Sequence, residues 1–337
     1  MIILGRRKLK APKRGSLGYL PKARASSWTG RIRYCPEVKG DPRPLAFPGY
    51  KAGMTHLVTI DQMQGSLTFG KEISVPVTIL ETPPLIICGI KIYEKENRNL
   101  RSIGEAWSAN IPKEFERLIT LKKDANEQES LKRIENQLDR VSEVRVLAGT
   151  QPRLTSTGQK KPKLFEIKIG GGNTKDQFEH AKSLLGKEVR SSEVLKEGNL
   201  VDVIAITKGK GIQGPVKRWG IKTLLHKSRK TVRGVGSIGG WTPNFVMYSV
   251  PRAGQMGFFQ RTEFNKQIVK IGEDVKEVSP SSGFLNYGNV RNQYVMIKGS
   301  IPGASRRLVM MRAPARAKKM EPPPKIEYLS LESKQGD

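Results

Sequence analysis

The sequence predicts a mainly β fold with α-helical insertions and long, irregular, basic extensions. Eight segments, several of them rich in β-branched residues, are bounded by turn residues, which is typical of strands. Two segments carry apolar residues at the spacings of three and four that indicate a helix. Positive charge is concentrated in segments with few or no acidic residues, which indicates extensions that bind a polyanion.

The predicted strands lie mostly in the part of the chain that is nearly neutral. Segments such as ISVPVTIL and LVDVIAIT combine apolar and β-branched residues with turn residues at their ends. We predict strands over residues 55–60, 73–80, 84–93, 143–148, 163–169, 200–207, 293–299 and 306–312. These strands should form the folded body of the protein.

The first predicted helix lies between the third and the fourth strand. Leu131, Ile134, Leu138 and Val141 form one apolar stripe among alternating charges. Since both signs of charge are balanced there, we interpret the region as a structural insertion.

A second helix is predicted over residues 175–185. Thr174 and Gln177 match a capping box at its start, and Gly186 matches a stop at its end. Its apolar stripe consists of Phe178, Ala181 and Leu185.

The composition is globular apart from an unusual charge. The chain has 337 residues, enough for one large domain or two smaller ones. Its 60 Lys and Arg against 31 acidic residues give a net charge of +29, which favours nucleic acid or an anionic membrane as partner. Cys35 and Cys88 exclude a zinc knuckle or a disulfide framework and favour a reducing cytoplasm. No apolar run approaches the roughly 20 residues of a membrane helix, and no signal peptide is expected.

Three segments carry nearly all of the net charge. Residues 1–36 hold ten Lys and Arg and no acid, residues 207–266 hold twelve against Glu263 alone, and residues 298–319 hold seven and no acid. Solvated faces normally mix both signs, so these runs favour phosphate contact. We expect residues 1–36, rich in Gly, Pro and Ser, to be disordered alone and ordered by a polyanion.

Three glycine motifs resemble nucleotide loops but lack the necessary context. Residues 209–214 and 234–239 match G-x-G-x-x-G, yet Pro and Gly nearby prevent a helix of useful length, and the ribose-binding acid is missing. Residues 65–71 match a P-loop except that Glu72 replaces the Ser or Thr that ligates magnesium, so a hairpin turn is the better interpretation. The three histidines lack metal-ligand spacing. We therefore predict no cofactor, no metal site and no catalysis.

Residues 208–260 combine frequent glycines, regularly recurring Lys and Arg, and interleaved aromatic residues. Glycines let a backbone lie close to RNA, basic side chains neutralise phosphates, and aromatic rings stack on unpaired bases. The segment has too few aliphatic residues to fold on its own, so we expect it to become ordered in its partner. The residues that we expect to contact RNA are Arg6, Arg7, Lys8, Lys10, Lys13, Arg14, Lys208, Lys210, Lys217, Arg218, Trp219, Lys222, His226, Lys227, Arg229, Lys230, Arg233, Trp241, Arg252, Arg261 and Lys266.

Two tryptophans of this segment have alternative roles. Trp219 either anchors the base of the segment or stacks on RNA, and the sequence favours neither. Trp241 lies among glycines and a proline, with little core to join, so we expect it to pack on RNA at the tip of the segment.

Several long stretches of the sequence are distinctive enough to be compared with known families. They are GSLGYLP, FPGYKAGMTHLV, VPVTILETPP, IGGGNTKDQ, ITKGKGIQGPVKRWG, GWTPNFVMYSVPRAGQMGFFQRTEFNK and NYGNVRNQYVMIKGSIPGASRRLV. In content and order they resemble the universal large-subunit ribosomal protein L-three family, in its longer archaeal and eukaryotic form. The resemblance spans nearly the whole chain, and residues 105–160 are its least distinctive part.

The resemblance implies a β-barrel of the type found in translation factors. It also implies a basic amino-terminal arm and an internal extension that reaches through large-subunit RNA toward the peptidyl-transferase centre. A tryptophan at the tip of that extension lies near the aminoacyl-tRNA entry path in this family, and the words GGWTPNFVMYSV match it to Trp241. Some eukaryotic members carry a modified histidine about a dozen residues earlier, but the position here is near Arg229, so regulation by that modification is not expected.

On this interpretation the chain divides into seven parts: an arm over 1–48, the first part of the barrel over 49–104, a mixed insertion over 105–199, a barrel strand over 200–207, the extension over 208–260, the second part of the barrel over 261–315, and a tail over 316–337.

We expect a structural constituent of the large ribosomal subunit that supports early assembly and is not an enzyme. Its partners should be large-subunit rRNA and neighbouring ribosomal proteins. We expect it to bind no membrane and no small-molecule substrate, to form no homo-oligomer, and to be located in the cytoplasm. The alternatives are a free-standing RNA chaperone and an enzyme, either a nucleotide-dependent oxidoreductase or a translation GTPase.

Overall fold

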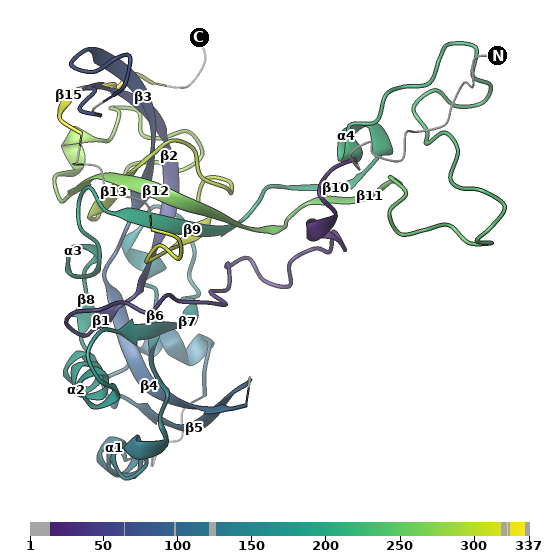
Figure 1. Cartoon of the computed structure of the whole chain (residues 1–337). Helices are drawn as coiled ribbons and strands as arrows, with labels where there is room; N and C mark the ends of the chain where they lie inside the picture. Colours follow the sequence, from purple (N-terminus) through teal and green to yellow (C-terminus); the bar gives the residue numbers. More distant parts are fainter. Residues whose placement is uncertain are drawn as a thin grey trace. The chain divides into compact units, whose positions relative to one another are not determined.

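The computed structural model describes residues 14–63, 65–97, 99–120, 126–317, 322 and 324–333. The chain forms two compact units, the smaller consisting of Met1–Ser27 with Ile206–Gln260 and the larger of Trp28–Ala205 with Arg261–Asp337. Strands dominate the larger unit, whereas most of the described chain of the smaller unit is irregular (Figure 1). None of the helices in the described ranges is long and apolar enough to cross a membrane.

The larger unit contains a seven-stranded sheet. Its order is β14–β9–β12–β13–β3–β2–β15, and β14 also pairs with β2, so the pairings of the six strands from β14 to β2 follow one another in a ring. Strand β2 is long enough to pair with β14 through its first half and with β15 through its second half. The strands are β2 (Ala46–Ile60), β3 (Glu72–Glu81), β9 (Leu200–Ile206), β12 (Gln260–Gly272), β13 (Tyr294–Lys298), β14 (Leu308–Arg312) and β15 (Ile326–Leu329).

A second sheet of the same unit has six strands in the order β1–β7–β6–β4–β5, with β8 paired to β4. These strands are β1 (Arg43–Pro44), β4 (Leu85–Glu96), β5 (Asn99–Trp107), β6 (Glu143–Gly149), β7 (Leu164–Gly170) and β8 (Glu188–Val189). Helix α1 (Glu127–Glu135) packs on β5, and α2 (Thr174–Leu184) packs mainly on β6. The shorter helices of this unit are α3 (Ser191–Val194) and the 3-10 turns Lys113–Arg117, Leu138–Arg140, Pro152–Leu154 and Val275–Glu277.

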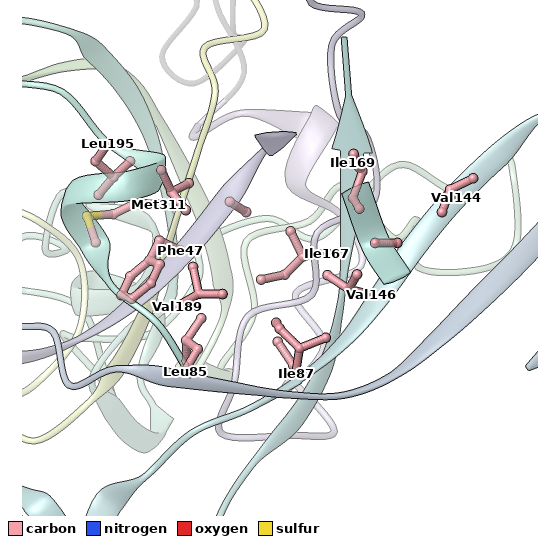
Figure 2. Packing of buried hydrophobic residues seen from close by; sticks show 14 of the residues in the cluster. Phe47, Leu85, Ile87, Val144, Val146, Ile167, Ile169, Val189, Leu195 and Met311 are labelled. Atoms are coloured by element: carbon pink, nitrogen blue, oxygen red, sulfur yellow. The ribbon is translucent and has the colours of Figure 1, made fainter. Parts of the chain in front are cut away.

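Both sheets contribute side chains to the main apolar core. Figure 2 shows Phe47 of β2 and Met311 of β14 together with residues of β4, β6 and β7 such as Ile87, Val146 and Ile167. Strand β13 is buried on both faces, because Val295 and Ile297 join this core whereas Tyr294 and Met296 join a second cluster. Successive side chains of a strand point to opposite faces, so the two clusters lie on the two sides of β13.

A buried ion pair fixes the strands between which the extension is inserted. Asp202 of β9 accepts hydrogen bonds from Arg312 Nη2 of β14 at 3.0 Å and from the backbone N–H of Asn265 in β12 at 3.1 Å. It also accepts the Ala315 N–H at 2.9 Å. The carboxylate is fully buried and the Arg312 side chain is 7% exposed. Three strands therefore converge on one charge.

All eight predicted strands are present, and a helix is present at both predicted places. The first is shorter than its apolar stripe predicted, because α1 ends at Glu135, while Leu138 belongs to a separate 3-10 turn and Val141 follows that turn. Strand β2 begins nine residues before the predicted 55–60, because Pro48, Gly49 and Gly53 mask its pattern. Gly53 is required by a close approach, since a Cβ there would lie 2.4 Å from the Phe284 ring. The remaining strands, which are short or polar, were not predicted from the sequence: β1, β5, β8, β10, β11, β12 and β15.

One local prediction needs correction. The cap of α2 is formed by Asn173 and Asp176, one position before the predicted Thr174 and Gln177, because Asn173 is the N-cap and its N–H donates to the Asp176 carboxylate at 3.0 Å. The predicted barrel segment 49–104 includes β4 and most of β5, but both strands pair within the six-stranded sheet. Apolar patterning identifies a strand without identifying its partner, so this boundary could not be derived from the sequence.

Candidate nucleic-acid interface

The smaller unit is built on a two-stranded ladder. Strand β10 (Gly209–Gln213) pairs antiparallel with β11 (Gly254–Gly257), and the one-turn helix α4 (Pro215–Trp219) follows β10 (Figure 1). Pro215 starts α4, and Gly220 ends it in the left-handed conformation at φ +62°. A 3-10 turn over Leu17–Tyr19 belongs to the amino-terminal arm of this unit.

Trp219 anchors this unit. Its side chain is 8% exposed, and its Nε1–H donates to the Arg252 carbonyl over 2.8 Å. Lys22 of the arm places Nζ 3.6 Å from the centroid of the ring, and Gly15 packs on the edge of the same ring. The tryptophan thus joins the arm to the return strand of the extension. Of the two roles that the sequence left open for Trp219, the 8% exposure of its side chain and these contacts favour the anchor over stacking on RNA.

Arg218 reinforces the same junction. Its Nε donates to the Gln255 carbonyl at 3.0 Å and its Nη1 to the Arg252 carbonyl at 2.9 Å. The guanidinium is half-buried, so its charge is held in a fixed place beside β11.

A hollow of about 790 Å³ lies next to Trp219 within the same unit. Leu17, Leu20 and Pro21 of the arm line one part, and residues 246–252 line another. Tyr248 remains 74% exposed there, so an aromatic ring is presented next to Lys22 and Arg252. An apolar hollow with cationic residues in its lining suits a nucleobase attached to a phosphate.

From Ile221 to Ala253 the chain, all of it described, forms turns and bends but no helix or strand. Trp241 is 95% exposed, which places its indole in solvent. The predicted site residues with exposed side chains are Arg14, Lys208, Lys210, Lys217, Lys222, His226, Lys227, Arg229, Lys230, Arg233, Trp241 and Arg252.

The charge of the smaller unit has no internal counter-charge. Residues 1–27 and 206–260 contain no Asp or Glu. The larger unit differs, because its cations pair with carboxylates, as in Lys168–Glu143 at 2.9 Å and Arg145–Glu166 at 3.0 Å. A compact unit with only positive charge is stabilised by an external polyanion.

Other predicted site residues lie elsewhere. Arg261 and Lys266 are half-buried on β12, and most of that strand belongs to the larger unit. Lys266 pairs with Glu263 at 2.8 Å and donates to the Ser300 carbonyl, so its charge is already compensated and its predicted RNA contact is less favourable. Arg6, Arg7, Lys8, Lys10 and Lys13 lie outside the described residues.

Among the described residues, none of the three glycine motifs precedes a helix of more than one turn. Residues 65–71 belong to the hairpin connection between β2 and β3, closed by a hydrogen bond from Gly70 N–H to the Asp61 carbonyl. Residues 209–213 form β10, and the helix after them has a single turn. No helix follows residues 234–239 before β11. Among the residues that the structure describes, no cluster of three His, Cys, Asp or Glu is placed to hold a metal ion.

Sequence reasoning missed one basic surface, in the larger unit. Trp28, Lys160, Lys161, Lys163 and Arg306 line a common groove. The signal in the sequence was the run KKPK at 160–163, which the balanced charge of the surrounding insertion obscured.

Comparison with known proteins gives one family over the whole chain. The model of the family "Ribosomal protein L3" matches residues 4–336. The "Large ribosomal subunit protein uL3" of Methanothermobacter thermautotrophicus is 47% identical over 331 residues, which cover 96% of this chain and 98% of the relative. That of Archaeoglobus fulgidus is 46% identical over 340 residues, which cover 98% of this chain and 99% of the relative. With a matching family model and relatives of this similarity over nearly their full length, the chain belongs to the ribosomal protein L3 family.

Proposed function

We propose that this protein is a structural constituent of the large ribosomal subunit, in the cytoplasm, and has no catalytic activity of its own. The observation that carries the proposal is the smaller unit, which contains many exposed cations and no acid. Each cation that neutralises a phosphate releases counterions from RNA, so such a unit gains binding free energy from ribosomal RNA. Neighbouring large-subunit proteins are its expected protein partners.

The two units have different roles in this proposal. The six strands whose pairings form a ring are the translation-type β-barrel, and they supply the stable body. Residues 208–260 and the arm 1–48 enter rRNA during early assembly. Trp241, exposed and remote in sequence from the ladder of β10 and β11, packs on RNA near the peptidyl-transferase centre and organises it. The anchoring of the arm on Trp219 supports this, because both RNA-binding segments then start from one fixed junction.

Sedimentation of cell extracts tests the proposal. The tagged full-length protein should migrate with large subunits and stay there after a moderate salt wash. A free-standing RNA chaperone would return to the top of the gradient after that wash, and this result would refute the proposal.

A charge-matched pair of variants sharpens the test. Lys227→Gln, Arg229→Gln and Lys230→Gln together should reduce incorporation into subunits, because they remove exposed cations from the extension. The control K187Q/K196Q/K276Q removes the same charge from exposed positions of the larger unit and should incorporate normally. Equal loss in both sets would mean that net charge alone matters, not the extension.

A further inference from the structure

The larger unit carries a basic groove outside the arm and the extension. It has a volume of about 490 Å³ and is formed by Trp28 and Thr29, residues 159–163, and residues 304–308. Three segments that are far apart in the sequence therefore meet at one surface. All of them belong to the larger unit.

The walls of the groove are fixed by backbone hydrogen bonds. Arg306 N–H donates to the Lys51 carbonyl at 2.8 Å, and Lys51 N–H donates to the Arg307 carbonyl at 3.0 Å, which ties the 304–307 turn to β2. Lys51 is itself buried and donates from Nζ to the Ile301 carbonyl at 2.7 Å. On the opposite side, Thr150 and Lys163 exchange two hydrogen bonds, Thr150 N–H to the Lys163 carbonyl at 2.9 Å and Lys163 N–H to Thr150 Oγ1 at 3.0 Å. Groups held in this way lose little freedom on binding a ligand.

The lining combines cations with one presented aromatic ring. Lys160, Lys161 and Arg306 are exposed, and Lys163 is half-buried. The Arg307 guanidinium lies 4.6 Å from the centroid of the Trp28 ring, while Trp28 remains 65% exposed. The indole is thus held by the body of the protein but keeps enough surface for one base to stack on it.

We infer that this groove is a second RNA-binding site, which takes an unpaired nucleotide with its base on Trp28 and its flanking phosphates on Lys160, Lys161, Lys163 and Arg306. The groove-lining residues, all within the described ranges, include no Asp or Glu, so nothing repels a phosphate. An aromatic ring among cations is the arrangement that binds single-stranded RNA, through stacking and charge together.

The charge pattern favours RNA over a protein partner. Protein interfaces are depleted of lysine, and their cores are apolar, whereas three of the lining residues here are lysines. The inference rests on the proposed function, because it takes ribosomal RNA as the ligand, but it places a contact on the body of the protein rather than on the extensions.

Equilibrium binding of the full-length protein to deproteinised large-subunit rRNA, measured across a range of salt concentrations, tests the inference. Each phosphate contact with single-stranded RNA contributes about 0.7 to the slope of log K against log salt. The variant K160Q/K161Q/K163Q should therefore lower the slope by about two. The control K187Q/K196Q/K276Q, with the same loss of charge at exposed sites outside the groove, should leave it unchanged.

Stacking is tested separately at Trp28. Loss of one stacked base weakens binding by about tenfold, so Trp28→Ala should show that loss, and Trp28→Phe, which keeps a ring, should recover most of it. Ultraviolet cross-linking of the wild-type complex should give a nucleotide adduct on the peptide that contains Trp28.

Three results would overturn the inference. The first is that both the lysine variant and Trp28→Ala bind rRNA with the same affinity and the same salt slope as the wild-type protein. Another is an adduct confined to peptides from 208–260. The third is that the lysine variant or Trp28→Ala loses a cross-link to a neighbouring protein in assembled subunits while its binding to rRNA stays unchanged. That result would make the groove a protein contact. If the wild-type protein itself bound rRNA with a flat salt response, the proposed function would fail as well, so the two failures are distinguishable.

Discussion

Replacing Asp202 with Asn should destabilise the larger unit strongly without touching any exposed cation. The substitution keeps the size of the side chain but removes its charge. Arg312 then stays buried beside a neutral amide, with its Nη2 and Nε, now 3.0 and 3.3 Å from the carboxylate, facing no counter-charge. The Asn amide group must also compete for the backbone N–H groups of Asn265 and Ala315.

The expected loss of stability follows from the burial of both Asp202 and Arg312. Removing one partner of a buried ion pair costs about 3–5 kcal/mol of unfolding free energy, because the remaining charge is left uncompensated. For a unit of about this size, 1 kcal/mol shifts the melting temperature by about 2–4 °C. D202N should therefore lower the melting temperature by roughly 6–20 °C.

Urea and thermal unfolding of the purified full-length protein, without RNA, measure this effect. The matched control is Asp139→Asn, at a side chain that is 93% exposed, and it should change stability by less than about 0.5 kcal/mol. In a double-mutant cycle with Arg312→Met, the double variant should be clearly more stable than the sum of the single losses predicts. A D202N protein within 1 kcal/mol of wild type, or strictly additive losses, would refute this account of the pair.

The remaining predictions concern the two tryptophans and the acid dependence of stability. Trp219→Ala should speed hydrogen exchange of the backbone amides in β11, because it removes the anchor, whereas Trp241→Ala should leave that exchange unchanged. Unchanged exchange in Trp219→Ala would contradict the anchoring role of Trp219. Ribosomes with Trp241→Ala should accommodate aminoacyl-tRNA abnormally while the protein's stability changes by less than about 0.5 kcal/mol; normal accommodation would refute the tip role. Burial acts to raise the pKa of Glu143, but hydrogen bonds from Arg145 and Lys168 outweigh it, so its pKa lies below the ordinary 4.5. The ionised carboxylate therefore stabilises the fold above pH 4.5 and ceases to do so as the pH falls through the lowered pKa. The difference in melting temperature between wild type and Glu143→Gln should be full at pH 7 and shrink in acid, and a constant difference would contradict this.

Strands with a strong apolar pattern could be predicted from the sequence, and those defined by their neighbours could not. Strand β9 (LVDVIAI) is visible because all but its first residue are buried, and apolar β-branched residues are what such a strand requires. Strand β12 (QRTEFNKQIVKIG) contains mostly polar residues in its first half, and it is a strand because it is paired on both sides. The sequence of one strand, taken without its neighbouring strands, does not reveal that pairing.

The candidate site was predictable where charge and composition are local. The acid-free run over 208–260 and the isolated Trp241 are properties of one contiguous segment, and the structure leaves Trp241 and most of the cations of the run exposed. The role of Trp219 depends on Gly15, Lys22 and Arg252, which lie up to 204 residues away, so the sequence could not choose between packing and stacking. The groove at Trp28 was missed for the same reason, because three separate segments form it.

The salt dependence of binding to deproteinised large-subunit rRNA tests the central claim most directly. If the arm and the extension bind RNA through exposed cations without internal counter-charges, log K should fall linearly with log salt. Ten phosphate contacts would give a slope of about −7 to −9. Replacing Lys227, Arg229 and Lys230 with Gln should bring the slope closer to zero by about two. A nearly flat response of the wild-type protein, or an unchanged slope in that variant, would contradict the account.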